Sequence, residues 1–319
     1  MKFQLVQRSE RANIIFGGSS DEWSSRVPEC STMRVSKCMR TDMVYVSVPG
    51  SREDVLHLMA EKQLDSIPVV KKGTRNLVGM VTRFDLLRKA DEDQLAMLMN
   101  RNPTTVTEDD ELATVAKKMV ETGNRVVPVV DAQHDLVGLV SVLDVLDAAL
   151  KDSKGLEEEN ISGFVRRKVS AVWDQTPLPL AYMIMEMAGE NALVVLNSRG
   201  GVTGVISVSD FIKMSEESTE DKVMVTHSET ESSVEWGWTS KDFLVVTSKL
   251  LKLPDVPVER IVTRNVITVT EVTSVSECVR TLRKSDIDQA PVLSYAGSLI
   301  GMIEDMDLLP ILFREDKPQ

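Results

Sequence analysis

Four seven-residue stretches share one spacing of glycine and aspartate: GMVTRFD (79–85), GLVSVLD (138–144), GVISVSD (204–210) and GMIEDMD (301–307). A short apolar run precedes each of them: IPVV from Ile67, VPVV from Val127, LVVL from Leu193 and APVL from Ala290. Proline stands second in three of these runs, and Val194 replaces it in the third. Self-similarity of this kind indicates a structural unit that is repeated along the chain.

Each apolar run follows a predicted amphipathic helix. Apolar residues recur at helical spacing as Val55, Leu58 and Met59; Leu112, Val115, Ala116 and Met119; Ala181, Ile184, Met185 and Ala188; and Val275, Cys278, Val279 and Leu282. This period places them on one buried face of a helix. Before each helix lies a strand-like stretch: MVYVSV (43–48), TTVT (104–107), VSAVW (169–173) or VITVT (266–270).

Turn residues complete the unit. Between the two apolar runs of each copy lie KKGTRN (71–76), DAQHD (131–135), NSRGG (197–201) or YAG (295–297). These sequences are typical of tight turns. Each unit therefore reads strand, helix, strand, turn, strand, helix, which predicts an α/β (α+β) fold of four β-α-β-β-α repeats.

The length of one unit, about 60 residues, is small for a stable core on its own. We therefore expect the repeats to pair. Residues 1–30 form an N-terminal extension, 31–150 a first module of repeats 1 and 2, 151–160 a charged linker, and 161–315 a second module of repeats 3 and 4. An insertion at about 216–255 interrupts the second module and carries Trp236 and Trp238, which could bind a partner or pack on the chain itself.

Composition excludes several classes of function. The net charge is −12, from 37 basic and 49 acidic side chains, and an acidic surface repels nucleic acid. Three cysteines without a CxxC motif predict free thiols in a reducing cytoplasm and no zinc site. No apolar run is long enough for a membrane span. No nucleophile, base and orienting residue stand in a recognisable motif, so we expect a protein that is not an enzyme and needs no metal.

The repeat resembles the CBS domain, whose β-α-β-β-α unit ends in glycine, two apolar residues, serine or threonine, and aspartate. The resemblance covers most of residues 35–313 outside the insertion. The arrangement is similar to the four-repeat gamma subunit of AMP-activated kinase and to stand-alone tandem CBS proteins of archaea and bacteria. It implies that adenosyl ligands bind in clefts between paired repeats.

The resemblance also implies roles for individual residues. The hydroxyl would meet phosphate, the aspartate the ribose hydroxyls, and an apolar strand residue the adenine. Repeat by repeat, the implied ligand-binding residues are Thr82, Asp85 and Ile67; Ser141, Asp144 and Val127; Ser207, Asp210 and Leu193; and Asp307. Glu304 replaces the hydroxyl in repeat 4 and would repel phosphate there.

A basic residue three positions before the strand proline is a further phosphate contact in the kinase subunits. Repeat 2 has Arg125 there, whereas repeats 1 and 4 have Asp65 and Asp288, and repeat 3 has Asn191 in the matching place. The resemblance thus favours a nucleotide site in the first module, built from Asp144, Ser141, Thr82, Asp85 and Arg125. The same serine–aspartate pattern is also close to a helix capping box.

These observations predict a regulatory module that senses AMP, ADP or ATP and signals to an unidentified effector protein. A sensor of S-adenosylmethionine or a related ligand is the first alternative, favoured by Glu304 because a sulfonium is a cation. A protein-interaction scaffold with vestigial clefts is the second. The two modules could close into a disc within one chain, or two chains could pair as a homodimer.

Overall fold

Every predicted repeat forms a small sheet with flanking helices. The computed structural model describes residues 33–89, 92–152, 159–214, 216–220, 248–262 and 266–313. The elements of the first module are β1 (Val46–Val48), α2 (Arg52–Lys62), β2 (Ser66–Lys71), β3 (Leu77–Thr82), α3 (Arg83–Arg88), α5 (Leu112–Thr122), β4 (Val126–Val130), β5 (Leu136–Ser141) and α6 (Val142–Asp152). The mixed α/β fold class is therefore confirmed.

The second module repeats this order. Its elements are β6 (Ala171–Trp173), α7 (Leu178–Ala188), β7 (Ala192–Leu196), β8 (Val202–Ser207), α8 (Val208–Met214), β11 (Val269–Thr270), α9 (Val275–Lys284), β12 (Gln289–Leu293), β13 (Leu299–Glu304), α10 (Asp305–Leu308) and the 3-10 helix η5 (Leu309–Leu312). Between repeats 3 and 4, β9 (Glu216–Glu220) pairs antiparallel with β10 (Ser248–Lys252). Trp236, Trp238 and residues 1–30 lie outside the described residues.

The sheets share one topology. A short first strand pairs parallel with the second, and the second pairs antiparallel with the third, in the orders β1-β2-β3, β6-β7-β8 and β11-β12-β13. In repeat 2 the predicted strand TTVT is wrong: only an isolated bridge from Val106 to Val129 forms. The sheet of that repeat therefore consists of β4 and β5 alone.

The hairpin turns explain the positions of the turn glycines. Gly73, Gly200 and Gly297 have φ angles of 79°, 77° and 79°, in the left-handed region that glycine tolerates best. His134 takes the same place in repeat 2 with φ 64°. Each hairpin also shifts register at one equivalent step, as between Val69 and Val70.

A segment that we call the lead precedes each repeat, and the leads of repeats 1, 2 and 3 cross the sheet of the partner repeat in the same module. The leads begin with η2 (Val35–Lys37), α4 (Leu95–Leu98), η3 (Ile161–Gly163) and η4 (Val258–Arg260). Isolated bridges join Arg40 to Leu139, Asn100 to Met80 and Arg166 to Met302. The motif glycines permit this approach: a Cβ at Gly138 would stand 3.1 Å from the Arg40 carbonyl oxygen, and one at Gly301 would stand 2.5 Å from that of Arg166.

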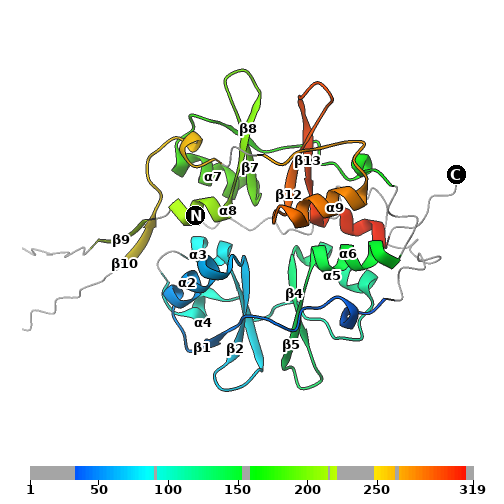
Figure 1. Ribbon diagram of the computed structural model, residues 1–319. Coiled ribbons are helices and arrows are strands. Elements are labelled where there is room, and N and C mark those ends of the chain that lie inside the picture. The colour runs from blue at the N-terminus through cyan, green and yellow to red at the C-terminus, as the bar shows by residue number, and fades with distance from the viewer. Residues whose placement is uncertain are drawn as a thin grey trace, which may run out of the picture.

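Repeats 1 and 2 contact each other through their hairpins. Val70 and Leu77 of repeat 1 pack with Val130 and Leu136 of repeat 2 in one small buried cluster. A bridge from Asn76 to Asp135 continues this contact. Figure 1 shows the hairpins pointing away from the middle of the molecule, where the helices lie.

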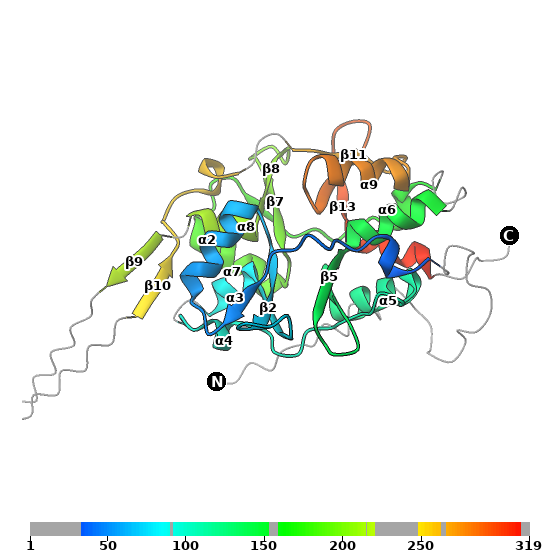
Figure 2. The same cartoon turned by 60° about the horizontal axis from the view of Figure 1, so that its bottom comes forward.

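The last helices of the repeats meet across the boundary between the two modules. Helix α3 contacts α8, while α6 contacts α9 and α10 (Figures 1 and 2). Repeat 1 thus faces repeat 3, and repeat 2 faces repeat 4. No helix in the described ranges has the length and apolar character that a membrane crossing needs.

Repeats 2 and 4 share one hydrophobic core. Leu146 of α6, Leu282 of α9 and Ile311 of η5 belong to a single cluster of buried side chains. Repeats 1 and 3 instead have a core each, centred on residues such as Leu86 and Phe211. We call repeats 2 and 4 the 2–4 half, and repeats 1 and 3 the 1–3 half.

Candidate functional site

The motif aspartates lie in the first turn of α3, α6, α8 and α10, and three of them share a capping geometry with a hydroxyl residue. The hydroxyl of Thr82 donates to Asp85 Oδ2 at 2.6 Å, that of Ser141 to Asp144 Oδ2 at 2.6 Å, and that of Ser207 to Asp210 Oδ2 at 2.9 Å. The backbone N–H of each hydroxyl residue donates to the same oxygen. This capping satisfies donors at the start of the helix and leaves Oδ1 for other partners.

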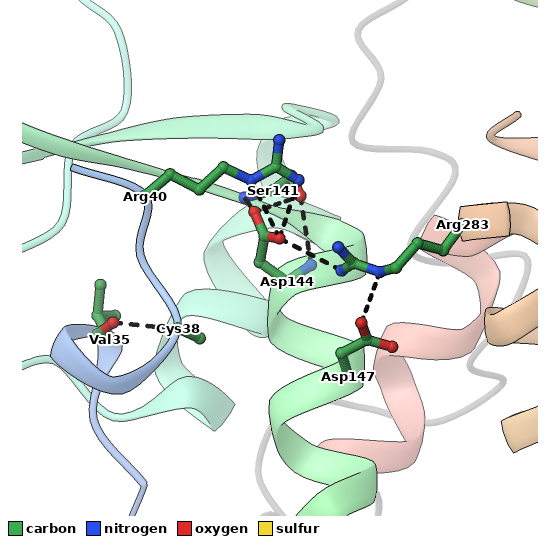
Figure 3. A network of polar contacts seen from close by, with 7 residues as sticks. All are labelled: Val35, Cys38, Arg40, Ser141, Asp144, Asp147 and Arg283. Carbon is green, nitrogen blue, oxygen red and sulfur yellow. Dashed lines mark hydrogen bonds and ion pairs between the residues drawn. The ribbon is translucent and has the colours of Figure 1, made fainter. Parts of the chain in front are cut away.

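In repeat 2, two arginines occupy the remaining oxygen. Asp144 Oδ1 lies 3.0 Å from Nη2 of Arg40 and 3.2 Å from Nη2 of Arg283. Figure 3 shows the two guanidinium groups approaching this carboxylate from opposite sides, Arg40 from the lead and Arg283 from α9 of repeat 4. Nε of Arg283 also pairs with Asp147 at 2.5 Å.

The Asp144 side chain is only 8% exposed. Burial acts to raise its pKa, but the hydrogen bonds from Ser141 and Arg40 outweigh burial and hold the pKa of Asp144 below its ordinary value. The carboxylate is therefore charged at neutral pH and fully engaged.

Repeat 4 has an equivalent cluster around Arg166. Its guanidinium pairs with Glu304 at 2.5 Å, with Asp307 at 3.0 Å and with Glu190 at 3.3 Å. Burial raises the pKa of Asp307 to about 6, opposed by Arg166 and assisted by Glu304. Glu304, which departs from the motif, thus holds an arginine of its own module.

Asp85 and Asp210 in the 1–3 half have a different environment. Both side chains are half-buried, and no lysine or arginine within the described ranges forms an ion pair with either. Asn100, the counterpart of Arg40 in the lead that crosses repeat 1, is exposed and accepts a hydrogen bond from the backbone of Asn102. Oδ1 of these two aspartates therefore faces no competing cation among those residues.

Arg125 lies at the boundary between the modules. Its Nη2 atom pairs with Asp305 at 2.6 Å and with Asp288 at 3.2 Å, both from repeat 4. Asp305 is 4% exposed, and burial raises its pKa to about 7 against the effect of Arg125. No hydrogen bond or ion pair in the described structure joins the Arg125 side chain to Asp144, Ser141, Thr82 or Asp85, so its phosphate role stays a prediction.

A second set of contacts crosses the boundary at repeats 1 and 3. Asp65 pairs with Arg83 of its own repeat at 2.9 Å and accepts a hydrogen bond from Ser209 of α8 at 3.3 Å. Within the described ranges, no group of three or more His, Cys, Asp or Glu side chains is arranged to hold a metal ion.

The apolar residues expected to contact adenine lie inside the cores. Ile67, Val127 and Leu193 each expose 0% of their surface. A ligand could reach them only if the packing opened, because they point to the core face of their strands. These three side chains are packed in the cores, and their role in binding adenine stays a prediction.

Sequence reasoning did not identify three functional candidates: Arg40, Arg166 and Arg283. The first two could have been found, because each stands five residues after the buried residue that begins a lead helix, Val35 or Ile161. Arg283 could not, because its partner Asp144 belongs to a different module and only the docking of α9 on α6 brings them together.

Known proteins match both the sequence and the fold. Residues 35–92, 95–151 and 258–314 match the model of the CBS domain and together make up more than half of the chain. Repeat 3 falls outside these matches, although β6, α7, β7, β8 and α8 have the same order as in the other repeats.

Archaeal proteins are among the most similar relatives. An uncharacterised Methanocaldococcus jannaschii protein, MJ0188, is 32% identical over 132 residues, which span 41% of this chain and about half of that relative (49%). The structure of an uncharacterised conserved protein from Pyrococcus horikoshii is 28% identical, covers 88% of this chain and 100% of its own, and has a TM-score of 0.59. That of M. jannaschii MJ1225 is 22% identical, covers 88% and 99%, and has a TM-score of 0.70, which supports the fold. With its matches to three repeats and the same fold in the remaining one, the chain belongs to the CBS-domain family.

Proposed function

We propose that this protein is a regulatory module that binds adenine nucleotides (AMP, ADP or ATP) in clefts between its CBS repeats and transmits their binding to an effector protein. It does so without catalysing a reaction. CBS-domain proteins are typically regulatory, and the aspartates that the family uses for ribose are present in all four repeats.

One observation supports a sensor above the other candidates: each motif aspartate stands at the start of a helix that forms the boundary between the modules. Asp85 lies in the first turn of α3 and Asp210 in the first turn of α8, and these two helices contact each other. A ligand held by such an aspartate acts on the boundary directly. It shifts the relative position of the modules by as much as its affinity differs between the two arrangements.

S-adenosylmethionine is a second candidate, favoured by the contacts of Arg125. A nucleotide phosphate needs basic partners, but Arg125 is already paired with Asp305 and Asp288. A ligand that carries a sulfonium needs no such partner. The two ligand classes therefore predict opposite outcomes in one experiment.

The test is thermal unfolding of ligand-stripped protein with AMP, ADP, ATP and S-adenosylmethionine in parallel. A ligand at a hundred times its dissociation constant stabilises the native state by about 2.7 kcal/mol. For a chain of this size we expect a rise in Tm of roughly 5–10 °C. A rise with a nucleotide supports the proposal, and a rise with S-adenosylmethionine alone supports the second candidate. No rise with any of the four contradicts both and favours a scaffold.

A further inference from the structure

Three of the leads can be compared at one position that lies over the sheet of the partner repeat. Five residues after the first residue of each lead helix stand Arg40, Asn100, Arg166 and Thr263, of which Thr263 lies outside the described residues. The bridges from Arg40 to Leu139, from Asn100 to Met80 and from Arg166 to Met302 show that the first three occupy the same place on the partner sheet. At this position the sequence has arginine in the leads that cross repeats 2 and 4, and asparagine in the lead that crosses repeat 1.

These two arginines bind the groups that a ribose would need. Two ribose hydroxyls would donate to a motif carboxylate, and a guanidinium already paired with that carboxylate must leave first. Arg40 holds Asp144 at 3.0 Å, and Arg166 holds Asp307 at 3.0 Å and Glu304 at 2.5 Å. Displacing either arginine takes a charged partner away from a buried carboxylate, which the hydroxyls of the ligand would have to replace.

We propose that Arg40 and Arg166 are specificity-determining residues that close repeats 2 and 4 to adenosyl ligands, so that the ligand occupies repeats 1 and 3 at Asp85 and Asp210. This inference rests on the proposed function and adds which repeats are used and what excludes the others.

The two arginines differ in how firmly they hold the motif carboxylates of repeats 2 and 4. The Arg40 side chain is 59% exposed, so solvent screens its pair with Asp144, although Arg283 adds a second cation there. Arg166 is 25% exposed and contacts three carboxylates, which makes repeat 4 the more firmly closed. Repeat 2 is therefore the one that a substitution can open.

The experiment is titration calorimetry on the full chain, with AMP and S-adenosylmethionine as separate probes. Asp85→Asn and Asp144→Asn form a matched pair, because each keeps a side-chain oxygen for the cap and removes the charge from one motif. Asp85→Asn should weaken one class of sites at least tenfold or abolish it, whereas Asp144→Asn should leave binding within about twofold. Arg34→Ala is the control for the loss of an exposed arginine next to the lead of repeat 1, since Arg34 pairs only with Asp109 in the described structure.

The double variant Arg40→Ala, Arg283→Ala frees Asp144 and should add a binding site that the natural protein lacks. The absence of an added site in a folded double variant contradicts the closure by arginine. Loss of binding in Asp144→Asn with full binding in Asp85→Asn overturns the inference, while the proposed function stands. If the double variant does not fold, the comparison of these two single variants serves as the test. No binding of either probe to the natural protein overturns both.

Discussion

The 2–4 half and the 1–3 half of the molecule are built from the same repeat and differ in how they are held together. In the 2–4 half one hydrophobic core runs through both modules, and the motif carboxylates are paired with arginines. In the 1–3 half each repeat keeps its own core, and the described residues place no cation on Asp85 or Asp210. The repeat motif alone therefore does not make a ligand site, because its partners decide whether the carboxylate is available.

This difference assigns a mechanical role to each half. A continuous core cannot shear without losing packing, since interiors are close-packed. The 2–4 half then acts as the fixed point between the modules, and the contact of α3 with α8 is the place where ligand binding can change their relative position.

The largest loss of stability is expected from a cavity in the shared core of the 2–4 half. Leu146→Ala removes a fully buried side chain of α6 and should destabilise the protein by about 2–5 kcal/mol. Because this core spans both modules, they should lose stability together in calorimetry. The matched variant Leu86→Ala acts on the core of repeat 1 and should leave the unfolding of the second module unchanged. Equal effects of both variants on both modules would break the comparison between the halves.

The next largest effect is the loss of Arg125. Arg125→Ala leaves Asp305 buried without its 2.6 Å partner. Removing one member of a fully buried pair destabilises a protein by roughly 3–5 kcal/mol, and we expect about 2–3 kcal/mol because Arg125 is 23% exposed. Chemical denaturation at neutral pH measures the change. Arg34→Ala, at an exposed pair, should stay within about 0.5 kcal/mol and serves as the control. A near-zero change for Arg125→Ala would show that the boundary at repeats 2 and 4 does not depend on this pair.

A smaller change in the free energy of unfolding is expected when pH changes, because Asp305 titrates. The pKa of Asp305 is about 7 in the folded protein, against about 4 for an ordinary aspartate. The folded state therefore holds this proton more tightly, and the stability it contributes is full below pH 4 and lost as pH rises through 7. Between pH 6 and 7.5 the loss amounts to about 1 kcal/mol.

Asp305→Asn should make stability depend less on pH, and Tm measured against pH follows the change. Asp307 adds a decrease of the same sign at lower pH. A natural protein whose Tm rises with pH across this range would contradict the assignment.

Much of the fold follows from local sequence, since glycine spacing and helical periodicity are local signals. The helix stripe from Leu112 to Met119 and the turn at Gly73 lie where the sequence predicts them. The TTVT stretch failed as a strand: only Val106 pairs, in a single bridge with Val129. Strand length depends on pairing partners, which propensity does not contain.

The candidate site was less predictable than the fold. The motif aspartates are visible in the sequence, but their availability depends on contacts across modules, such as that of Arg283 with Asp144. Arg125 illustrates the same limit, because its position in the repeat suggested phosphate and its neighbours in space are Asp288 and Asp305. A residue's position within a repeat predicts its place in the fold, whereas its charge partners come from the docking of one repeat on another.

The most direct test of the difference between the halves is hydrogen exchange of the full chain with and without AMP or S-adenosylmethionine, followed by mass spectrometry. Ligand at Asp85 and Asp210 should slow exchange in peptides that contain the starts of α3 and α8, and leave the starts of α6 and α10 unchanged. Slowed exchange at α6 and α10, with no change at α3 and α8, would contradict the account.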